Sequence, residues 1–376
     1  MLGGPRWLRM RIAYVVGTRP NLVKMAPVIG ALRRRMPAAR HVLIHTGQHY
    51  DRQMSGVLMD ELGLPEPDHM LGVGSATHAV QTARTMERIE PVLADLRPDL
   101  VIVPGDVNST LAATLVAVKL GLRLAHLESG LRSFDRTMPE EINRIVADEF
   151  ADQLFLHCEE AVENLRREGI APERMHFVGN TMIDSLVAVM GRIAATRPSE
   201  RYALAPGQYL LVTLHRPALV DGPLLGAVVA RLAEVARSMP VLFPVHPRTC
   251  KMLAGLGVPA GLRLTEPLGY LDFLALERDA AAVLTDSGGV QEETTYLGVP
   301  CFTLRENTER PVTIRAGTNR LLGLDPARIL EIPSSLEDAR ARAAAIGRPP
   351  LWDGRAAERV ADVIEQARLD GQLQAA

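Results

Sequence analysis

The hydrophobic residues of this chain fall into short apolar runs that alternate with longer stretches of helical spacing. The run Ile12 to Val16 ends at Gly17, and Pro20 opens a stretch whose apolar residues recur every three or four positions. The same order returns with the run His41 to His45 and the helical stretch His78 to Leu96. This alternation predicts an α/β fold built on a doubly wound parallel sheet.

The alternation continues through the first half of the chain and then restarts. In the first half we expect strands at Leu100 to Val103, Arg123 to His126, Leu154 to Leu156 and His176 to Val178, with a helix at Leu111 to Leu120. Arg192 to Pro206, rich in small residues and proline, is typical of a linker. In the second half we expect strands at Tyr209 to Leu214, Val241 to Val245, Leu262 to Leu264, Ala281 to Thr285 and Cys301 to Leu304. We therefore predict two domains of the same class, over residues 10–185 and 186–352, and a tail helix over 355–370 that could pack on either.

Composition excludes several classes of protein. A net charge of −2 and a pI of about 6.6 give no reason to expect a nucleic-acid or membrane partner. The three cysteines are widely spaced, which argues against a zinc site or a disulfide framework. No apolar run approaches a membrane span of about 18 residues, and the basic leader lacks a signal-peptide pattern. We expect a reduced, cytoplasmic enzyme with no metal.

The second half carries a candidate phosphate-binding turn. A predicted strand ends at Asp286, and Ser287, Gly288 and Gly289 then open a helix. Glycines allow close approach of backbone N–H groups to an anion, and the helix N-terminus favours negative charge. An ordinary tight turn capped by Asp286 or Ser287 explains the turn equally well.

Other polar residues sharpen the choice between these two readings. Glu293 could accept hydrogen bonds from ribose hydroxyls, whereas Glu292 reads better as a carboxylate that stabilises the first helical turn. His215 and Arg216 follow another strand, so an anion-binding cleft is favoured.

The first half lacks every common nucleotide fingerprint but places acids after its strands. It contains no G-x-G-x-x-G and no P-loop, which argues against nicotinamide chemistry. The candidate residues after or near strand ends are Arg19, Lys24, Asp106, Glu128 and Glu140. Asp106 could instead cap the helix beginning near Asn108, and Thr137 to Glu140 could form a capping box. Only three of the 42 basic residues are lysines, so Lys24 draws attention.

These residues lie in segments that resemble the non-hydrolysing UDP-N-acetylglucosamine 2-epimerase family. The matching segments, in order, are G-T-R-P-N-L-V-K-M-A-P, P-G-D-V-N-S-T, H-L-E-S-G-L-R-S, M-P-E-E-I-N-R, V-G-N-T-M-I-D, T-L-H-R, P-V-H-P-R and D-S-G-G-V-Q-E-E-T. The resemblance implies a GT-B-type fold, with two Rossmann-like domains facing a central cleft and the last helix crossing back to the first domain. It also implies a homodimer, a UDP-sugar substrate and no cofactor.

The resemblance also assigns roles. It implies catalytic roles for Lys24, Asp106, Glu128, Glu140 and His215, a phosphate turn at Ser287, Gly288 and Gly289, a ribose acceptor in Glu293, and substrate-binding cations in Arg19 and Arg216. Gln48, His49 and Arg84 resemble residues that bind an activating UDP-sugar in some members, although Tyr50 and Asp51 depart from that subgroup. Pro217 to Leu219 replaces a polar pair found in many members, which leaves the identity of the sugar open.

Four functions remain open from the sequence. The first is epimerisation at C2 of UDP-N-acetylglucosamine, or of a related UDP-sugar such as a diacetamido uronic acid, by elimination of UDP to a 2-acetamidoglucal and re-addition. The others are a hydrolysing epimerase that releases UDP and N-acetylmannosamine, a GT-B glycosyltransferase, and a non-enzymatic nucleotide-sugar binder. The carboxylates of the first half disfavour the last two.

Overall fold

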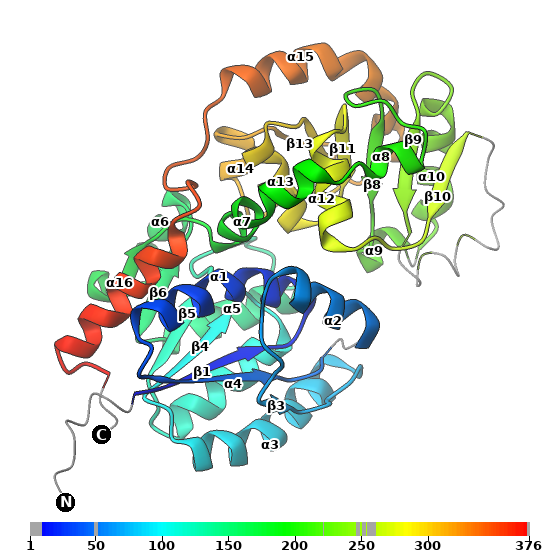
Figure 1. Cartoon of the computed structure of the whole chain (residues 1–376). Helices are drawn as coiled ribbons and strands as arrows, with labels where there is room; N and C mark the ends of the chain where they lie inside the picture. Colours follow the sequence, from blue (N-terminus) through cyan, green and yellow to red (C-terminus); the bar gives the residue numbers. More distant parts are fainter. Residues whose placement is uncertain are drawn as a thin grey trace, which may run out of the picture. The chain divides into compact units, whose positions relative to one another are not determined.

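The structure of the protein is a computed structural model that describes residues 10–48, 52–220, 222–245, 249, 253 and 261–373. The chain divides into two compact units. Unit 1 comprises Met1–Val187 and Pro350–Ala376, and unit 2 comprises Ala188–Pro349. Each unit contains one sheet flanked by helices (Figure 1), and the strand pairings within the described residues are all parallel.

The sheet of unit 1 has the strand order of a Rossmann fold. Its described strands run β3-β2-β1-β4-β5-β6-β7, so the chain reverses direction across the sheet between β1 and β4. The strands are β1 Arg11–Val16, β2 Arg40–His45, β3 His69–Met70, β4 Leu100–Pro104, β5 Leu124–Leu127, β6 Gln153–Leu156 and β7 Met175–Phe177. The helices are α1 Arg19–Arg35, α2 Arg52–Glu61, α3 His78–Leu96, α4 Asn108–Lys119, α5 Pro139–Phe150 and α6 Glu159–Arg167, with a 3-10 turn at Pro172–Arg174. Because helices cover both faces of this sheet, its central strands β1 and β4 are almost entirely apolar.

Unit 2 repeats this order. Its described strands run β10-β9-β8-β11-β12-β13, and the reversal falls between β8 and β11. The strands are β8 Leu210–Thr213, β9 Val241–Pro244, β10 Leu262–Thr265, β11 Ala282–Thr285, β12 Cys301–Thr303 and β13 Asn319–Leu321. The helices are α8 Pro198–Arg201, α9 Pro217–Val220, α10 Leu224–Val235, α12 Tyr270–Arg278, α13 Gly288–Leu297, α14 Val312–Arg315 and α15 Ile332–Ala345, with a 3-10 segment at Pro326–Glu331. Apolar clusters fill both faces of this sheet.

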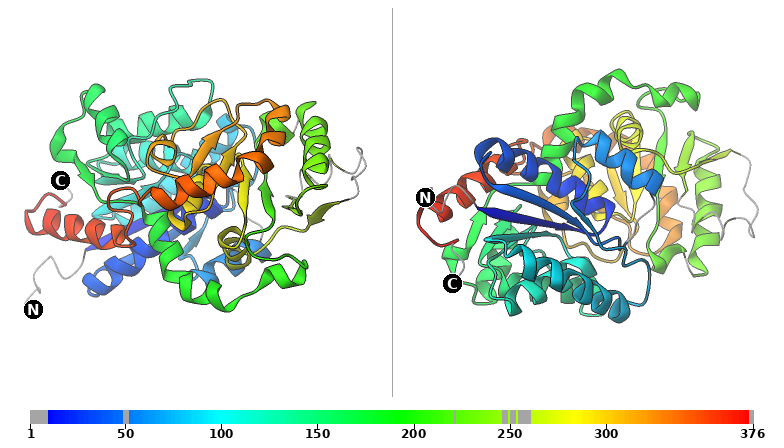
Figure 2. Two further views of the ribbon diagram at one scale, coloured as in Figure 1. Left: turned by 90° about the horizontal axis from the view of Figure 1, so that it is seen from above. Right: turned by 60° about the horizontal axis from the view of Figure 1, so that its bottom comes forward.

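Two helices complete the framework. Helix α7, Thr181–Ala195, extends past the boundary between the units, so the predicted linker from Arg192 begins inside a helix and contains α8. Helix α16, Ala356–Leu369, packs beside α1 in unit 1 (Figure 2). Arg35 on α1 pairs with Asp362 and Glu365 on α16, both at 2.7 Å. Asp184 on α7 accepts the first N–H groups of α16, from Ala356 at 3.1 Å and Ala357 at 2.6 Å.

The α/β fold class predicted from periodicity is confirmed. The predicted helix His78 to Leu96 matches α3 at both ends. The short strands β3 and β13 have no counterpart among the predictions, because two or three residues carry no readable alternation. Within the described ranges, no helix is long and apolar enough to cross a membrane.

Candidate active site

In unit 1 the loops after β1 and β4 meet at the point where the strand order reverses, where open α/β sheets bind ligands. Buried Asn21 joins the two loops. Its Oδ1 accepts N–H groups of Gly17 at 3.1 Å and Thr18 at 3.3 Å, and its Nδ2 donates to the Pro104 carbonyl at 3.2 Å. Asn21 therefore sets where α1 begins relative to the end of β4, and so where Lys24, one turn further along, is placed.

Lys24 on α1 and Glu128 after β5 form a direct ion pair between Nζ and Oε2. Each side chain is only 8% exposed, so the two charges compensate each other largely out of water. Gly105 lies directly beside them, because a Cβ added there would stand 3.1 Å from both Glu128 Oε2 and Lys24 Nζ. With φ at +62°, Gly105 also adopts a left-handed conformation that suits glycine. The pair borders a small pocket that Val178, Gly179, Asn180 and Thr181 help to line.

Glu128 itself is strained. Its φ of 64° lies in the left-handed region, which is unfavourable for a residue with a Cβ. Such strain persists only where the surroundings enforce it, and it concentrates at functional sites. In this left-handed conformation the Glu128 carboxylate contacts Lys24.

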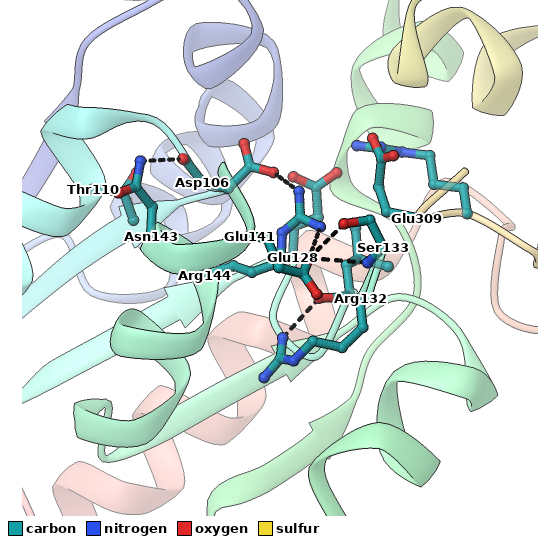
Figure 3. A network of polar contacts seen from close by, with 12 residues as sticks. Asp106, Thr110, Glu128, Arg132, Ser133, Glu141, Asn143, Arg144 and Glu309 are labelled. Carbon is teal, nitrogen blue, oxygen red and sulfur yellow. Dashed lines mark hydrogen bonds and ion pairs between the residues drawn. The ribbon is translucent and has the colours of Figure 1, made fainter. Parts of the chain in front are cut away.

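Asp106 is held by an arginine, Arg144, for which the sequence predicts no role. Arg144 on α5 donates to Asp106 Oδ2 at 2.5 Å and to Glu141 Oε2 at 2.7 Å (Figure 3). Asn143 donates to the backbone carbonyl of Asp106 at 2.9 Å. The reading of Asp106 as a helix cap is wrong, because α4 begins after Val107 with no side-chain cap. The segment M-P-E-E-I-N-R contains both Asn143 and Arg144, but their shared partner Asp106 lies on a loop distant in sequence.

The remaining candidates of unit 1 are half-buried at helix starts. Glu140 lies in the first turn of α5, and Arg19 is the first residue of α1. The predicted capping box from Thr137 to Glu140 is not formed, since the N-cap is Met138 and makes no side-chain cap bond. Thr137 donates instead to Asp135, through its backbone N–H at 2.9 Å and its hydroxyl at 2.6 Å.

Unit 2 places a second polar cluster at its own reversal point, between β8 and β11. The Asp286 carboxylate accepts the backbone N–H of His215 at 2.9 Å and of Arg216 at 2.7 Å, and pairs with His215 Nδ1 at 3.0 Å. Burial alone would raise the pKa of Asp286, but these hydrogen bonds and the His215 ring hold it below the ordinary value. Asp286 is therefore no N-cap of α13. It orients His215, whose side chain remains half exposed.

The glycine turn that opens α13 is packed against a buried guanidinium. A Cβ added at Gly288 would lie 2.3 Å from Arg310 Nη1, so any larger residue would require the buried guanidinium to move. Arg310 pairs with Glu309 and, through Nε at 3.0 Å, with Glu292. Burial opposes ionisation of Glu309, but Arg310 and Arg305 keep the pKa of this carboxyl well below its usual range. Among the described residues, α13 has no side-chain cap at Ser287, and a helix N-terminus of this kind suits an anion.

Glu292, expected as a first-turn carboxylate, and its neighbour Glu293 are both buried in α13. Helix α13 begins at Gly288, so neither residue is in its first turn, and the reading of Glu292 as a stabiliser of that turn is wrong. Glu292 is buried against Arg310. Burial, together with the charge of Glu292, raises the pKa of Glu293 to about 8, and a hydrogen bond with Tyr270 opposes this rise. Fully buried Glu277 on α12 adds a third acid to this group.

The residues predicted to bind an activating sugar are only partly described. Gln48 is buried, and its Oε1 accepts the N–H and hydroxyl of Ser109 at 3.1 and 2.8 Å. Arg84 is exposed on α3. His49 lies outside the described residues. Among the described residues, no group of His, Cys, Asp and Glu side chains has the arrangement of a metal site.

The chain has two Rossmann-like domains of GT-B type, each with polar groups where its strand order reverses. This arrangement is typical of proteins that bind nucleotide sugars. The sequence model of the family described as UDP-N-acetylglucosamine 2-epimerase matches residues 31–365, and the chain belongs to this family.

Individual relatives are similar over most of their length. A UDP-N-acetylglucosamine 2-epimerase from Methanococcus maripaludis is 42% identical over 333 residues, covering 85% of this chain and 90% of the relative. A UDP-2,3-diacetamido-2,3-dideoxy-D-glucuronate 2-epimerase from Pseudomonas aeruginosa is 38% identical over 327 residues, covering 86% and 91%. The crystal structure of the Methanocaldococcus jannaschii UDP-GlcNAc 2-epimerase, in complex with UDP-GlcNAc and UDP, matches with a TM-score of 0.85 and 37% identity, covering 95% of this chain and all of that one.

Proposed function

We propose that this protein is an isomerase that interconverts UDP-N-acetylglucosamine and UDP-N-acetylmannosamine. Membership of the family supports the reaction type, and the similarity to a structure that contains UDP-GlcNAc and UDP supports the substrate. The observation that carries the proposal is the buried Lys24–Glu128 pair on a strained turn, because acid and base groups of this kind are what inversion at C2 requires.

The reaction we propose needs no redox step. One carboxylate removes the proton from C2, the C–H electron pair forms the C1–C2 double bond, and the C1–O bond to UDP breaks with its electrons leaving on UDP, which gives a 2-acetamidoglucal and UDP. UDP then adds back at C1 while a proton is delivered to the opposite face of C2. Acid and base groups on the two faces would each contribute about 10²- to 10⁴-fold.

Unit 1 supplies the candidates for this proton transfer. Asp106, Glu128 and Glu140 are the proposed acid and base groups, and which of them removes the proton is left open. Lys24 and Arg144 already pair with Glu128 and Asp106 respectively. We infer that Lys24 also stabilises negative charge that develops as the leaving oxygen departs.

Unit 2 supplies the candidates for UDP binding. Ser287, Gly288 and Gly289 would bind the diphosphate through backbone N–H groups, with His215 and Arg216 as flanking cations or donors. Glu293 would accept the ribose hydroxyls, and Arg19 of unit 1 would contact the substrate as a cation. We further propose domain limits of 10–185 and 186–352, a homodimer, a cytoplasmic location and regulation through Gln48, His49 and Arg84.

The test is to incubate the protein with UDP-GlcNAc in D₂O and follow both sugars by NMR. We expect deuterium at C2 in a sugar that remains attached to UDP. Release of free N-acetylmannosamine would show a hydrolysing epimerase instead. Exchange only with the UDP-diacetamido uronate would place the chain with its Pseudomonas relative, and no exchange without an added acceptor would favour a glycosyltransferase.

A single substitution tests the assignment to unit 1. Glu128→Gln should abolish deuterium exchange because the amide can neither take up nor deliver the proton, while UDP binding measured by calorimetry should persist. Loss of UDP binding in this variant would contradict the role given to Glu128.

A further inference from the structure

One face of α5 presents three charged residues toward the loops that carry the proposed acids. Glu141, Arg144 and Asp148 follow one another at spacings of three and four, which places them on one side of the helix. All three are buried. Arg144 holds Asp106, and Glu141 accepts the backbone N–H groups of Ser133 and Phe134, both at 2.9 Å. Asp148 has no role in the mechanism proposed above.

The carboxylate of Asp148 is fully enclosed and accepts three hydrogen bonds. Its Oδ1 faces His126 Nδ1 at 2.7 Å, and its Oδ2 accepts the backbone N–H of Gly130 at 3.0 Å. Arg132 Nη1 also donates to Oδ2 at 2.7 Å. Burial would raise the pKa of Asp148, but the contacts with His126 and Arg132 hold it below the ordinary value.

These partners lie on both sides of Glu128. His126 precedes Glu128 by two residues and Gly130 follows it by two, so one carboxylate ties down both ends of the strained turn. A residue held at φ 64° needs such restraint, because release would let it relax to a favoured conformation and turn its side chain away.

His126 extends the same restraint to the second acid. Its Nε2 bonds to the Gly105 carbonyl oxygen at 2.7 Å, one residue before Asp106. Its two ring nitrogens therefore join Asp148 on α5 to the loop after β4, and each faces an acceptor. Through His126, the loops that carry Asp106 and Glu128 are both connected to the buried carboxylate of Asp148.

We propose that Asp148 is a positioning residue, which acts through His126 and Gly130 to hold Glu128 and the Gly105–Asp106 loop in the positions that proton transfer requires. The inference rests on the proposed epimerase function. It does not place Asp148 in contact with substrate.

The test is Asp148→Asn, with Asp152→Asn as a matched control. Asp152 also accepts a backbone N–H of β5, from Leu124 at 2.8 Å, and an arginine, Arg123 at 2.7 Å, but it does so at the amino end of the strand. An asparagine at 148 has one acceptor oxygen for three donors, so at least one of the hydrogen bonds between residue 148 and the turn should be lost. Turnover of UDP-GlcNAc per UDP-binding site should fall by about 10²-fold, as expected for a displaced catalytic group, and UDP affinity should not change.

A second readout separates positioning from folding. With substrate deuterated at C2, the isotope effect on turnover should be larger in Asp148→Asn than in the wild type, because proton transfer becomes slower, whereas Asp152→Asn should match the wild type. A smaller folded fraction would lower the rate without altering the isotope effect. If Asp148→Asn does not fold, His126→Gln, which keeps Asp148, should show the same pattern.

Two results would overturn the inference. The first is a rate per binding site and an isotope effect in Asp148→Asn that equal those of Asp152→Asn. The second is a loss of turnover that is matched by the loss of UDP-binding sites. A wild type that exchanges no hydrogen at C2 of any UDP-sugar would instead refute the proposed function, and the inference would fall with it.

Discussion

Lys24→Met isolates the energetic role of the buried ion pair. The substitution keeps most of the side-chain volume of Lys24 but removes the ammonium that pairs with Glu128. Since both side chains are 8% exposed, the Glu128 carboxylate would be left nearly desolvated beside a methyl group. Its backbone cannot move away easily, because the turn is anchored on both sides at His126 and Gly130.

The expected loss is large for a single substitution. Breaking a buried pair by removing one partner destabilises a protein by about 3–5 kcal/mol, and the small residual exposure favours the lower end. We therefore expect the free energy of unfolding of unit 1 to fall by about 3 kcal/mol. Glu128→Gln in the Lys24→Met background removes the buried carboxylate charge and should restore about 2 kcal/mol, which a double-mutant cycle measures as coupling.

The chain offers a local probe for the assay. Trp352 lies in unit 1, is 1% exposed, and donates to the His157 carbonyl at 2.8 Å, so its fluorescence reports unfolding of that unit. Trp7, the other tryptophan, is replaced by Phe in every variant. Urea unfolding at pH 7.5 then gives the four free energies of the cycle. A Lys24→Met variant as stable as the parent, with no coupling to Glu128→Gln, would refute the view that the two charges depend on each other.

Two further predictions concern backbone strain and buried acids. Glu128→Gly should be more stable than Glu128→Ala by about 1 kcal/mol in the same assay, because glycine accepts the left-handed φ that strains alanine; equal stabilities would show that the turn relaxes in both variants. Burial and the charge of Glu293 raise the pKa of Glu277 well above its ordinary value, so the folded chain keeps a proton there that the unfolded chain loses as the pH rises above about 4.5. Glu277 should therefore destabilise the folded chain increasingly as the pH rises above about 4.5, and Glu277→Gln should raise the calorimetric melting temperature by an amount that grows with pH. A gain that stays constant with pH, and equals the effect of the exposed control Glu337→Gln, would contradict this.

Much of the fold could be read from local patterns. The unbroken apolar runs of the central strands and the three-to-four spacing of α3 and α16 depend only on near neighbours in the chain. The capping predictions failed for a related reason. Asp106 and Asp286 are residues of a type and position that often cap helices. Each carboxylate instead binds groups of a different element: Asp106 binds Arg144, and Asp286 binds His215 and Arg216.

For the candidate site, too, the sequence identified residues and the tertiary structure showed their contacts. Sequence alone identified which residues could carry chemistry, since Lys24, Asp106, Glu128 and the glycine turn lie just after predicted strands. Only the tertiary structure brought Lys24 to Glu128 across 104 residues, and Arg144 to Asp106 across 38. It also showed that Asp148, which no sequence pattern singles out, binds the residues on both sides of the strained Glu128. Local patterns specify elements, but which charges neutralise each other is decided by the order of strands in the sheet and the face that α5 presents to it, because a buried charge is stable only beside its partner.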